Sequence, residues 1–220
     1  MKKRLIIAID GPAGSGKSTV AKEVARRLGI LYADTGAMYR ALTLKAMREK
    51  IDFKNKNMLI ELVGRIDIVL KTNDDFALSV LLDGEDVTDE IRKNSVTNNI
   101  KHIAHIPEVR KQMVALQRKI ASSGRAVLEG RDIGTIVFPD ANRKIYLDAN
   151  SGERAKRRHK ELKEKGHDIT IEEIEKDVEE RDYTDKNRAA GPLKKADDAI
   201  VIDTTNLTIA EVVERIIKEL

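Results

Sequence analysis

The sequence predicts an α/β fold in which a parallel sheet is flanked by helices, with a small antiparallel β insert and a helical lid. Short apolar runs, typical of strands buried on both faces, alternate with segments of helical periodicity along most of the 220 residues. Short strand-like runs and turn residues interrupt this alternation between residues 51 and 100. A highly charged segment, residues 152 to 198, precedes the last predicted strand. These three observations together favour this fold class.

The predicted sheet begins at residues 4–10, RLIIAID, which form a continuous apolar run. Apolar residues then follow helical spacing from Ser18, and Gly29 ends this helix at its C-cap. Residues 30–34 are a second predicted strand, and 37–50 a second helix. Because alternating strands and helices form a parallel sheet, we expect ligands at the carboxyl ends of the strands. The remaining core strands are predicted at 125–130, 144–149 and 199–203.

Turn and capping signals organise the rest of the chain. Residues 65–71 and 75–84 are predicted to be antiparallel strands, the second ended by Asp83-Gly84. A helix opens at Pro107 and ends at Gly124, and the capping box Thr208-x-x-Glu211 opens the last helix. We predict a single domain made of core segments 1–36, 105–150 and 190–220, an insert at about 37–104 and a lid at about 151–189.

Composition excludes several kinds of site and partner. There is no Cys, which rules out disulfides and thiolate metal sites. Of the four His, only His102 and His105 have ligand spacing, and we interpret them as solvated helix positions. No apolar run reaches the length of a membrane span, and the basic N-terminus leads into glycines rather than a signal cleavage site. We expect a soluble, cytoplasmic protein with no membrane partner.

The charge balance favours small phosphorylated ligands over nucleic acids. The 41 Lys and Arg residues are nearly matched by 37 Asp and Glu, which leaves a formal net charge of +4. Aromatic residues make up 3% of the chain, too few for a platform on which single-stranded bases could stack. We therefore expect no nucleic-acid partner.

The segment between the first strand and the first helix fits the phosphate-binding loop pattern Gly-x4-Gly-Lys-Ser. Glycines let successive backbone N–H groups point into one hollow, and the following helix adds its positive end. Lys17 would reach the outer phosphates, and the Ser18 hydroxyl would ligate Mg²⁺. The alternative, an ordinary Gly-rich turn, is disfavoured by the flanking strand and helix. We predict a P-loop NTPase type of fold whose nucleotide-binding residues are Gly11, Pro12, Ala13, Gly14, Ser15, Gly16, Lys17, Ser18 and Thr19.

Charged residues also follow the next two predicted strand ends. Arg40 ends the segment DTGAMYR, residues 34–40. Arg131 lies within the segment EGRD, residues 129–132. Arg can grip a phosphate with two parallel hydrogen bonds, so both segments suit a second, phosphorylated substrate. In the charged segment, arginines on a mobile flap could close over phosphates, although solvated surface charge is the alternative. These residues are Arg154, Arg157 and Arg158, which share one helix face, and then Arg181, Asp182, Asp185 and Arg188.

Taken together, these segments resemble the bacterial cytidylate kinases of the nucleoside monophosphate kinase group. The resemblance includes the extended insert at 51–100, which short adenylate-kinase-like chains lack. Two positions depart from the family pattern: Glu129 stands where Asp is frequent, and Lys101 where a small hydroxyl residue is possible. The matching segments cover nearly the whole chain in order: IDGPAGSGKST, DTGAMYR, LDGEDVTDEIR, IPEVR, EGRDIGTIVFPDA, KIYLDA and RDYTDKNRAAGPL.

The resemblance implies a role for each matching residue. Arg40 and Arg131 would grip the phosphate of the acceptor. The acceptor base and sugar would be bound by Thr35, Lys101, Arg110, Asp132, Asp185 and Arg188. The lid would clamp the phosphates with Arg154, Arg157, Arg158 and Arg181, of which Arg157 also counts among the residues that bind the nucleotide donor. Catalysis would depend on Lys17, Arg131, Arg154, Arg158 and Arg181.

The implied reaction is transfer of the γ-phosphoryl group from ATP·Mg²⁺ to CMP or dCMP by a monomer. Alignment and charge stabilisation supply most of the rate of such transfers. No general base is required, since the attacking phosphate oxygen of the acceptor is already ionised. The residues alone leave other functions open: UMP, another monophosphate or a small metabolite alcohol as acceptor, a nucleotide-gated regulator with a protein partner, or RNA binding through the Arg-rich segment.

Overall fold

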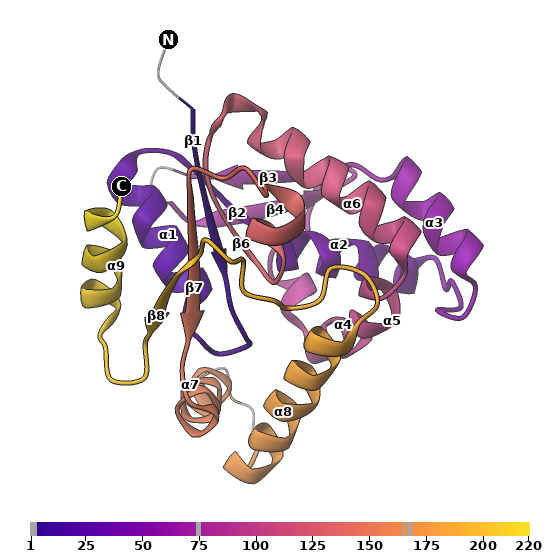
Figure 1. Cartoon of the computed structure of the whole chain (residues 1–220). Helices are drawn as coiled ribbons and strands as arrows, with labels where there is room; N and C mark the ends of the chain where they lie inside the picture. The colour runs from indigo at the N-terminus through magenta and orange to yellow at the C-terminus, as the bar shows by residue number, and fades with distance from the viewer. Residues whose placement is uncertain (1–3, 74–75, 165, 167–168) are drawn as a thin grey trace.

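A computed structural model describes residues 4–73, 76–164, 166 and 169–220. Its centre is a five-stranded parallel sheet with the strand order β2-β6-β1-β7-β8 (Figure 1). All five strands were predicted, and the observed bounds differ from the predicted ones by one residue at most. The strands are β1 (Leu5–Asp10), β2 (Leu31–Asp34), β6 (Arg125–Gly130), β7 (Arg143–Asp148) and β8 (Ile200–Asp203).

Helices cover both faces of this sheet, as the alternating pattern predicted (Figure 1). One face carries α1 (Lys17–Leu28) and α9 (Ile209–Lys218), and the other carries α2 (Thr35–Arg48) and α6 (Pro107–Ile120). The predicted capping box at Thr208 and Glu211 is present at the start of α9. Asp34 caps α2, so this helix begins two residues earlier than predicted. The buried strand residues Ile7 and Ile9 are fully enclosed between the two helical layers.

The insert forms a second, antiparallel sheet with the order β3-β4-β5. Asp83 and Gly84 both have positive φ, 51° and 88°, and they form the two-residue turn between β4 and β5. Two helices here, α3 and α4, were not predicted. The apolar residues Leu59, Leu62 and Val63 of α3 pack into the core. The elements are α3 (Lys56–Arg65), β3 (Ile68–Thr72), β4 (Leu78–Leu82), β5 (Glu85–Asp86), the 3-10 turn Glu90–Arg92, α4 (Asn94–Asn99) and α5 (Lys101–Ala104).

Two antiparallel strands were expected in the insert, and β3 and β4 fulfil that expectation with shifted ends. Their pairing places Ile68 opposite Leu82 and Thr72 opposite Leu78. The predicted turn at 72–74 lies partly outside the described residues. The strand predicted at 65–71 begins only at Ile68, because residues 56–65 belong to α3 instead.

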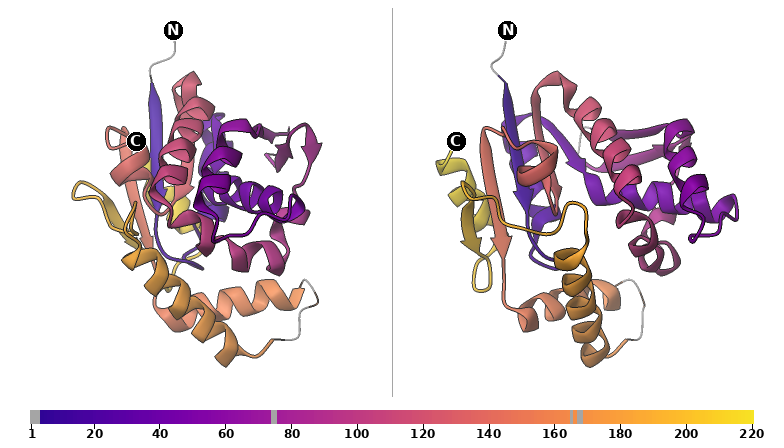
Figure 2. Two further views of the ribbon diagram at one scale, coloured as in Figure 1. Left: turned by 90° about the vertical axis from the view of Figure 1, so that its right-hand side faces the viewer. Right: turned by 45° about the vertical axis from the view of Figure 1, so that its right-hand side comes forward.

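The charged segment forms two helices beyond the carboxyl ends of the sheet strands (Figures 1 and 2). These are α7 (Ser151–Glu164) and α8 (Ile171–Asn187). The two helices share a small apolar cluster that is separate from the main core. The buried residues of this cluster are Ala155, Leu162, Ile174 and Val178. None of the helices in the described part of the chain is long and apolar enough to cross a membrane.

Candidate active site

The loop after β1 has the shape that its glycines predicted. Gly11, Gly14 and Gly16 all have positive φ, at 151°, 76° and 87°. A Cβ on Gly14 would lie 2.9 Å from the carbonyl oxygen of Arg154, and one on Gly11 would collide with the carbonyl oxygen of Leu147. Gly16 provides no side chain to cap α1, and the first turn of α1 contains no acidic residue. The first N–H groups of α1 are therefore suited to receive an anion.

Lys17 lies buried under this loop. Its Nζ donates to the carbonyl oxygen of Pro12 at 2.6 Å and to Ser15 Oγ at 3.3 Å. Burial lowers the pKa of Lys17 to about 7, helped by the nearby positive charge of Arg131 and opposed by Glu129. A bound anion would favour the charged form again.

Glu129, the penultimate residue of β6, lies beside this lysine. Burial raises the pKa of Glu129, and the negative charge of Asp34 acts in the same direction. The Tyr32 hydroxyl donates to its Oε1 at 3.0 Å, and the exposed Ser18 hydroxyl also bonds to Glu129. A hydroxyl and a carboxylate are the hard oxygen ligands that Mg²⁺ prefers, so these residues fit a metal that is carried mainly by nucleotide phosphates. Within the described ranges, no group of three or more His, Cys, Asp or Glu side chains could hold a metal by itself.

Three arginines converge on the cleft next to Lys17. Arg131 Nε donates to Asp185 at 2.7 Å, and Arg40 approaches Asp34 only to 3.9 Å. No hydrogen bond or ion pair with another described residue within 4 Å is found for Arg181. Burial lowers the pKa of Arg181 to about 10, and the positive charges of Arg131 and Arg40 add to the effect. Positive charge is thus concentrated here beyond what the neighbouring carboxylates neutralise.

A second cluster, buried between α2, α6 and the loop after β6, holds Arg110, Asp132 and Arg188. Arg110 Nη2 pairs with Asp132, and Arg110 Nη1 donates to the carbonyl oxygen of Ala104 at 3.3 Å. Arg188 Nη2 lies 3.6 Å from the other oxygen of Asp132. Gly191 has positive φ, and a Cβ there would collide with Asp132 and Arg110, so only glycine fits. Because the sequence predicts that these three charged residues bind the acceptor, we call them the acceptor cluster.

Other predicted acceptor residues lie at different distances from this cluster. Thr35 is buried at the start of α2, where its Oγ1 donates to the carbonyl oxygen of Glu129 at 2.7 Å. Asp185 links the two charged groups, because its other oxygen lies 3.5 Å from Arg188 Nη1. Lys101 is exposed and its Nζ lies 3.0 Å from Glu180 on α8. The structure therefore does not bring Lys101 into the acceptor cluster.

The structure separates the arginines of α7 that share one helix face. Arg154 is buried, and it donates to the carbonyl oxygens of Ala149 at 3.0 Å and Ala13 at 3.1 Å and pairs with Asp182 at 2.7 Å. Ala13 belongs to the phosphate-binding loop and Asp182 to α8. Arg154, itself on α7, therefore connects both lid helices to this loop.

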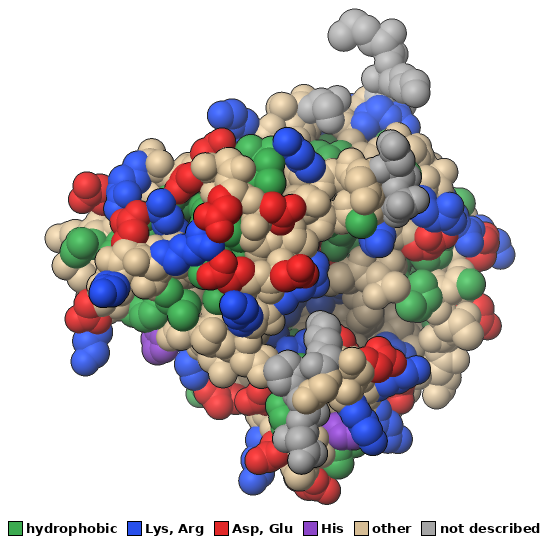
Figure 3. All heavy atoms as spheres, turned by 180° about the vertical axis from the view of Figure 1, so that it is seen from behind, with side chains coloured by type: hydrophobic (Ala, Val, Ile, Leu, Met, Phe, Trp, Pro, Cys, Tyr) green, Lys and Arg blue, Asp and Glu red, His purple; other side chains and the backbone are tan. Residues whose placement is uncertain are grey.

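Arg157 and Arg158 have different surroundings. Arg157 donates to Thr204 Oγ1 at 3.0 Å and to the Thr204 carbonyl oxygen at 2.6 Å, in the segment that follows β8. Among the residues that the structure describes, Arg158 pairs only with one of its own helix, Glu161, at 2.8 Å, and it is partly exposed. Arg158 is thus the least constrained of the three. The face seen in Figure 3 is hollowed between the body of the molecule and the lid, and Lys and Arg side chains border the hollow.

Comparison with known proteins supplies the deciding observation. The family model described as "Cytidylate kinase" matches residues 7–220 of this chain. The chain belongs to the cytidylate kinase family. It is 52% identical to a cytidylate kinase of Desulforamulus reducens over 99% of this chain and 97% of that protein. It is 49% identical to a cytidylate kinase of Clostridioides difficile over 98% of both.

A solved structure shows the same fold. An uncharacterized protein from Eubacterium ventriosum superimposes with a TM-score of 0.51 and covers 98% of both chains at 15% identity. The predicted family and the predicted P-loop type of α/β fold are therefore confirmed.

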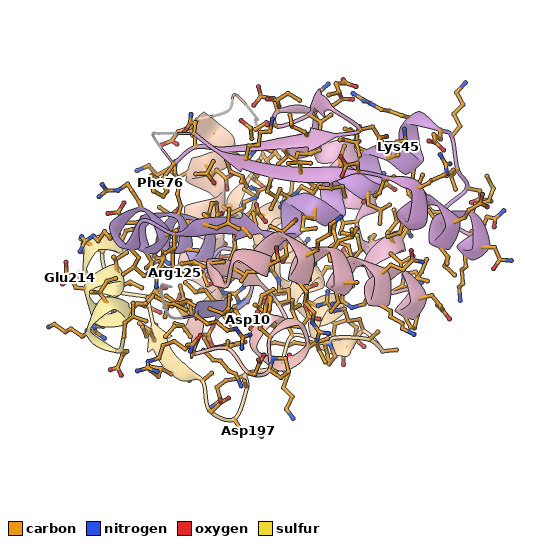
Figure 4. The ribbon with its side chains drawn as sticks, turned by 90° about the horizontal axis from the view of Figure 1, so that it is seen from above. Asp10, Lys45, Phe76, Arg125, Asp197 and Glu214 are labelled. Carbon is orange, nitrogen blue, oxygen red and sulfur yellow. The ribbon has the colours of Figure 1, made fainter. Side chains whose placement is uncertain are left out.

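Asp10, which holds two segments of the cleft together, was not predicted from the sequence. Asp10 ends β1 inside the molecule (Figure 4) and accepts hydrogen bonds from the backbone N–H groups of Ile133 at 2.8 Å and Gly134 at 2.7 Å. Burial raises its pKa to about 6, although these two bonds act in the opposite direction. Asp10 thereby ties the segment that carries Arg131 and Asp132 to the strand that carries the phosphate-binding loop. The available signal was an acidic residue at the end of an apolar strand.

Replacing Gly14 by Ala should destabilise the protein much more than the same change at Gly29. Both glycines have positive φ, but only at Gly14 does the new Cβ meet backbone, and nothing lies within 4 Å of it at Gly29. We expect a loss of about 3 kcal/mol or more for Gly14→Ala and about 1 kcal/mol for Gly29→Ala, measured by urea unfolding. Equal losses would contradict the close approach of Arg154 to the loop.

A polyphosphate bound at the loop should raise the pKa of Lys17 from about 7 toward its ordinary value of 10.5. At about pH 8, binding of a non-hydrolysable ATP analogue should then take up a proton, and its affinity should fall as the pH rises above 7. Calorimetry in buffers of different ionisation enthalpy measures this uptake. The Lys17→Met variant provides the control, and an unchanged proton uptake in that variant would contradict the assignment to Lys17.

Proposed function

We propose that this chain transfers the γ-phosphoryl group of ATP·Mg²⁺ to CMP and dCMP, giving CDP and dCDP. The observation that carries the proposal is Arg181, a guanidinium that forms no ion pair within 4 Å among the described residues, in a cleft that also contains Lys17 and Arg131. Such an excess of positive charge is costly unless anions occupy the cleft. The family membership supports the same activity, since the similar proteins from Desulforamulus reducens and Clostridioides difficile bear the name cytidylate kinase.

The donor triphosphate is assigned to the loop from Gly11 to Thr19. Backbone N–H groups of the loop and Lys17 would hold its phosphates. Ser18, with Glu129 behind it, would hold Mg²⁺, which when bound neutralises part of the phosphate charge. Arg157 is assigned to the donor side as well, because its guanidinium lies 4.0 Å from the position of a Cβ on Gly16 and reaches the segment after β8.

The acceptor is assigned to the opposite side of the cleft. Arg40 and Arg131 would grip its phosphate with two hydrogen bonds each. A carboxylate is the natural partner for the exocyclic amine of cytosine, and Asp132 supplies one in a setting shielded from water. The full set assigned to base and sugar is Thr35, Lys101, Arg110, Asp132, Asp185 and Arg188, of which Lys101 lies outside the buried cluster.

The transfer step needs alignment and charge stabilisation from the chain's own residues. Arg131 and Arg181 lie near enough to Lys17 for their charges to lower its pKa, and the three cations would offset the charge that develops between the two phosphates. Arg158 would join them when the lid, about 151–189, and the insert, about 37–104, close. Arg154 would act by keeping the lid on the loop. We place this activity in the cytoplasm and in a monomer.

One acceptor series tests the proposed function. With ATP and Mg²⁺, we expect rapid diphosphate formation from CMP and dCMP, less from UMP, and little from AMP or GMP. Lys17→Ala should lower turnover about a thousandfold while the melting temperature shows an intact fold. ATP hydrolysis that needs no acceptor would point instead to a nucleotide-gated regulator, and turnover of a metabolite alcohol to another kinase reaction.

Asp132→Asn tests how the base is recognised. An amide keeps one oxygen acceptor but adds an N–H donor, which suits the carbonyl of uracil better than the amine of cytosine. We expect kcat/KM for CMP to fall about tenfold or more while kcat/KM for UMP falls much less or rises. An equal loss for both acceptors would show that Asp132 has only a structural role.

A further inference from the structure

A buried hydroxyl without a partner lies inside the acceptor cluster. Tyr39 of α2 is 8% exposed, and its Oη has no hydrogen-bond partner among the residues that the structure describes. Native proteins leave few buried polar atoms unpaired, because each one costs stability. Phenylalanine would fill the same space without this cost, so the hydroxyl calls for an explanation.

The charged groups that surround the hydroxyl are those of the acceptor cluster. The guanidinium of Arg110 lies over the Tyr39 ring, 5.5 Å from the ring centroid. Arg110, Asp132 and Arg188 are also the charges that act on the ionisation of the hydroxyl. The Tyr39 side chain therefore lies next to the groups assigned to the acceptor base.

The hydroxyl remains a hydrogen-bond donor at neutral pH. Burial raises the pKa of Tyr39 to about 12, and the negative charge of Asp132 acts in the same direction while Arg110 opposes it. A neutral phenol can donate one hydrogen bond and accept another. It thus complements the carboxylate of Asp132, which only accepts, and the guanidinium of Arg110, which only donates.

Arg110 and Asp132 pair with each other in the structure, and a base that binds between them must share their hydrogen-bonding groups. We propose that Tyr39 is a specificity-determining residue of the acceptor site, whose hydroxyl forms a hydrogen bond with the bound pyrimidine nucleoside monophosphate. This inference rests on the proposed function. The nucleotide, which enters where Arg110 and Asp132 meet, completes the hydrogen bonding of the hydroxyl.

Tyr39→Phe tests this role because it removes only the hydroxyl and keeps the ring under Arg110. We expect the KM for CMP to rise about tenfold, the effect of losing one neutral hydrogen bond in a buried site. The KM for ATP should stay unchanged, and the melting temperature should be equal or higher. Tyr183→Phe is the matched control, because Tyr183 lies 71% exposed on α8, and we expect no change in either constant.

An unchanged KM for CMP in Tyr39→Phe, with the unmodified chain active, would overturn this inference and leave the proposed function intact. A lower melting temperature of the variant would also overturn it, since the hydroxyl would then stabilise the protein without nucleotide. If the unmodified chain used another monophosphate, the proposed function would fail, and the same comparison with that acceptor would decide the role of Tyr39. Failure to use any monophosphate would overturn both.

Discussion

Mutual repulsion of buried and half-buried positive charges is the constraint on which the rest of this structure depends. Lys17, Arg131 and Arg181 lie close enough together for each to disfavour the charge of another. Carboxylates reduce the repulsion only in part, because Asp185 pairs with Arg131 and no described carboxylate within 4 Å pairs with Arg181. The folded chain thus holds the cluster together at some expense of stability, and a phosphate that enters it relieves the repulsion.

Rigid backbone keeps these charges in place. Gly11 contacts the end of β7 and Gly14 contacts α7, so the curl of the phosphate-binding loop and the position of the lid are fixed by the same contacts. Asp10 adds a second link, from β1 to the segment after β6. The proposed donor and acceptor sides of the cleft are therefore joined through one short stretch of chain, which suits a reaction that depends on alignment.

Local patterns predicted the strands, the loop and most helices, because apolar periodicity, glycines and caps are properties of neighbouring residues. The helix α3 escaped prediction because its apolar positions lie between a turn-rich stretch and a strand-like run. Contacts between residues that are far apart in the sequence could not be predicted from such local patterns. Nothing near Arg154 indicates that it binds Ala13, and nothing near Tyr39 indicates that its hydroxyl stays unpaired. Lys101 was assigned to the acceptor site although it departs from the family pattern, and the structure places it in a surface ion pair.

The helices α7 and α8 bury Ala155, Leu162, Ile174 and Val178 against one another, apart from the main hydrophobic core. A pair of helices that carries its own interior can swing without exposing the apolar surface of the sheet layers, so its displacement does not require the protein to begin unfolding. Polar contacts connect this pair to the rest of the molecule, among them the hydrogen bonds from Arg154 to Ala13 and from Arg157 to Thr204 and the ion pair of Lys101 with Glu180. Dissolved salt would therefore weaken the exposed pair of Lys101 with Glu180 and leave the buried bonds of Arg154 nearly unchanged, so the two attachments of this helix pair respond differently to ionic strength.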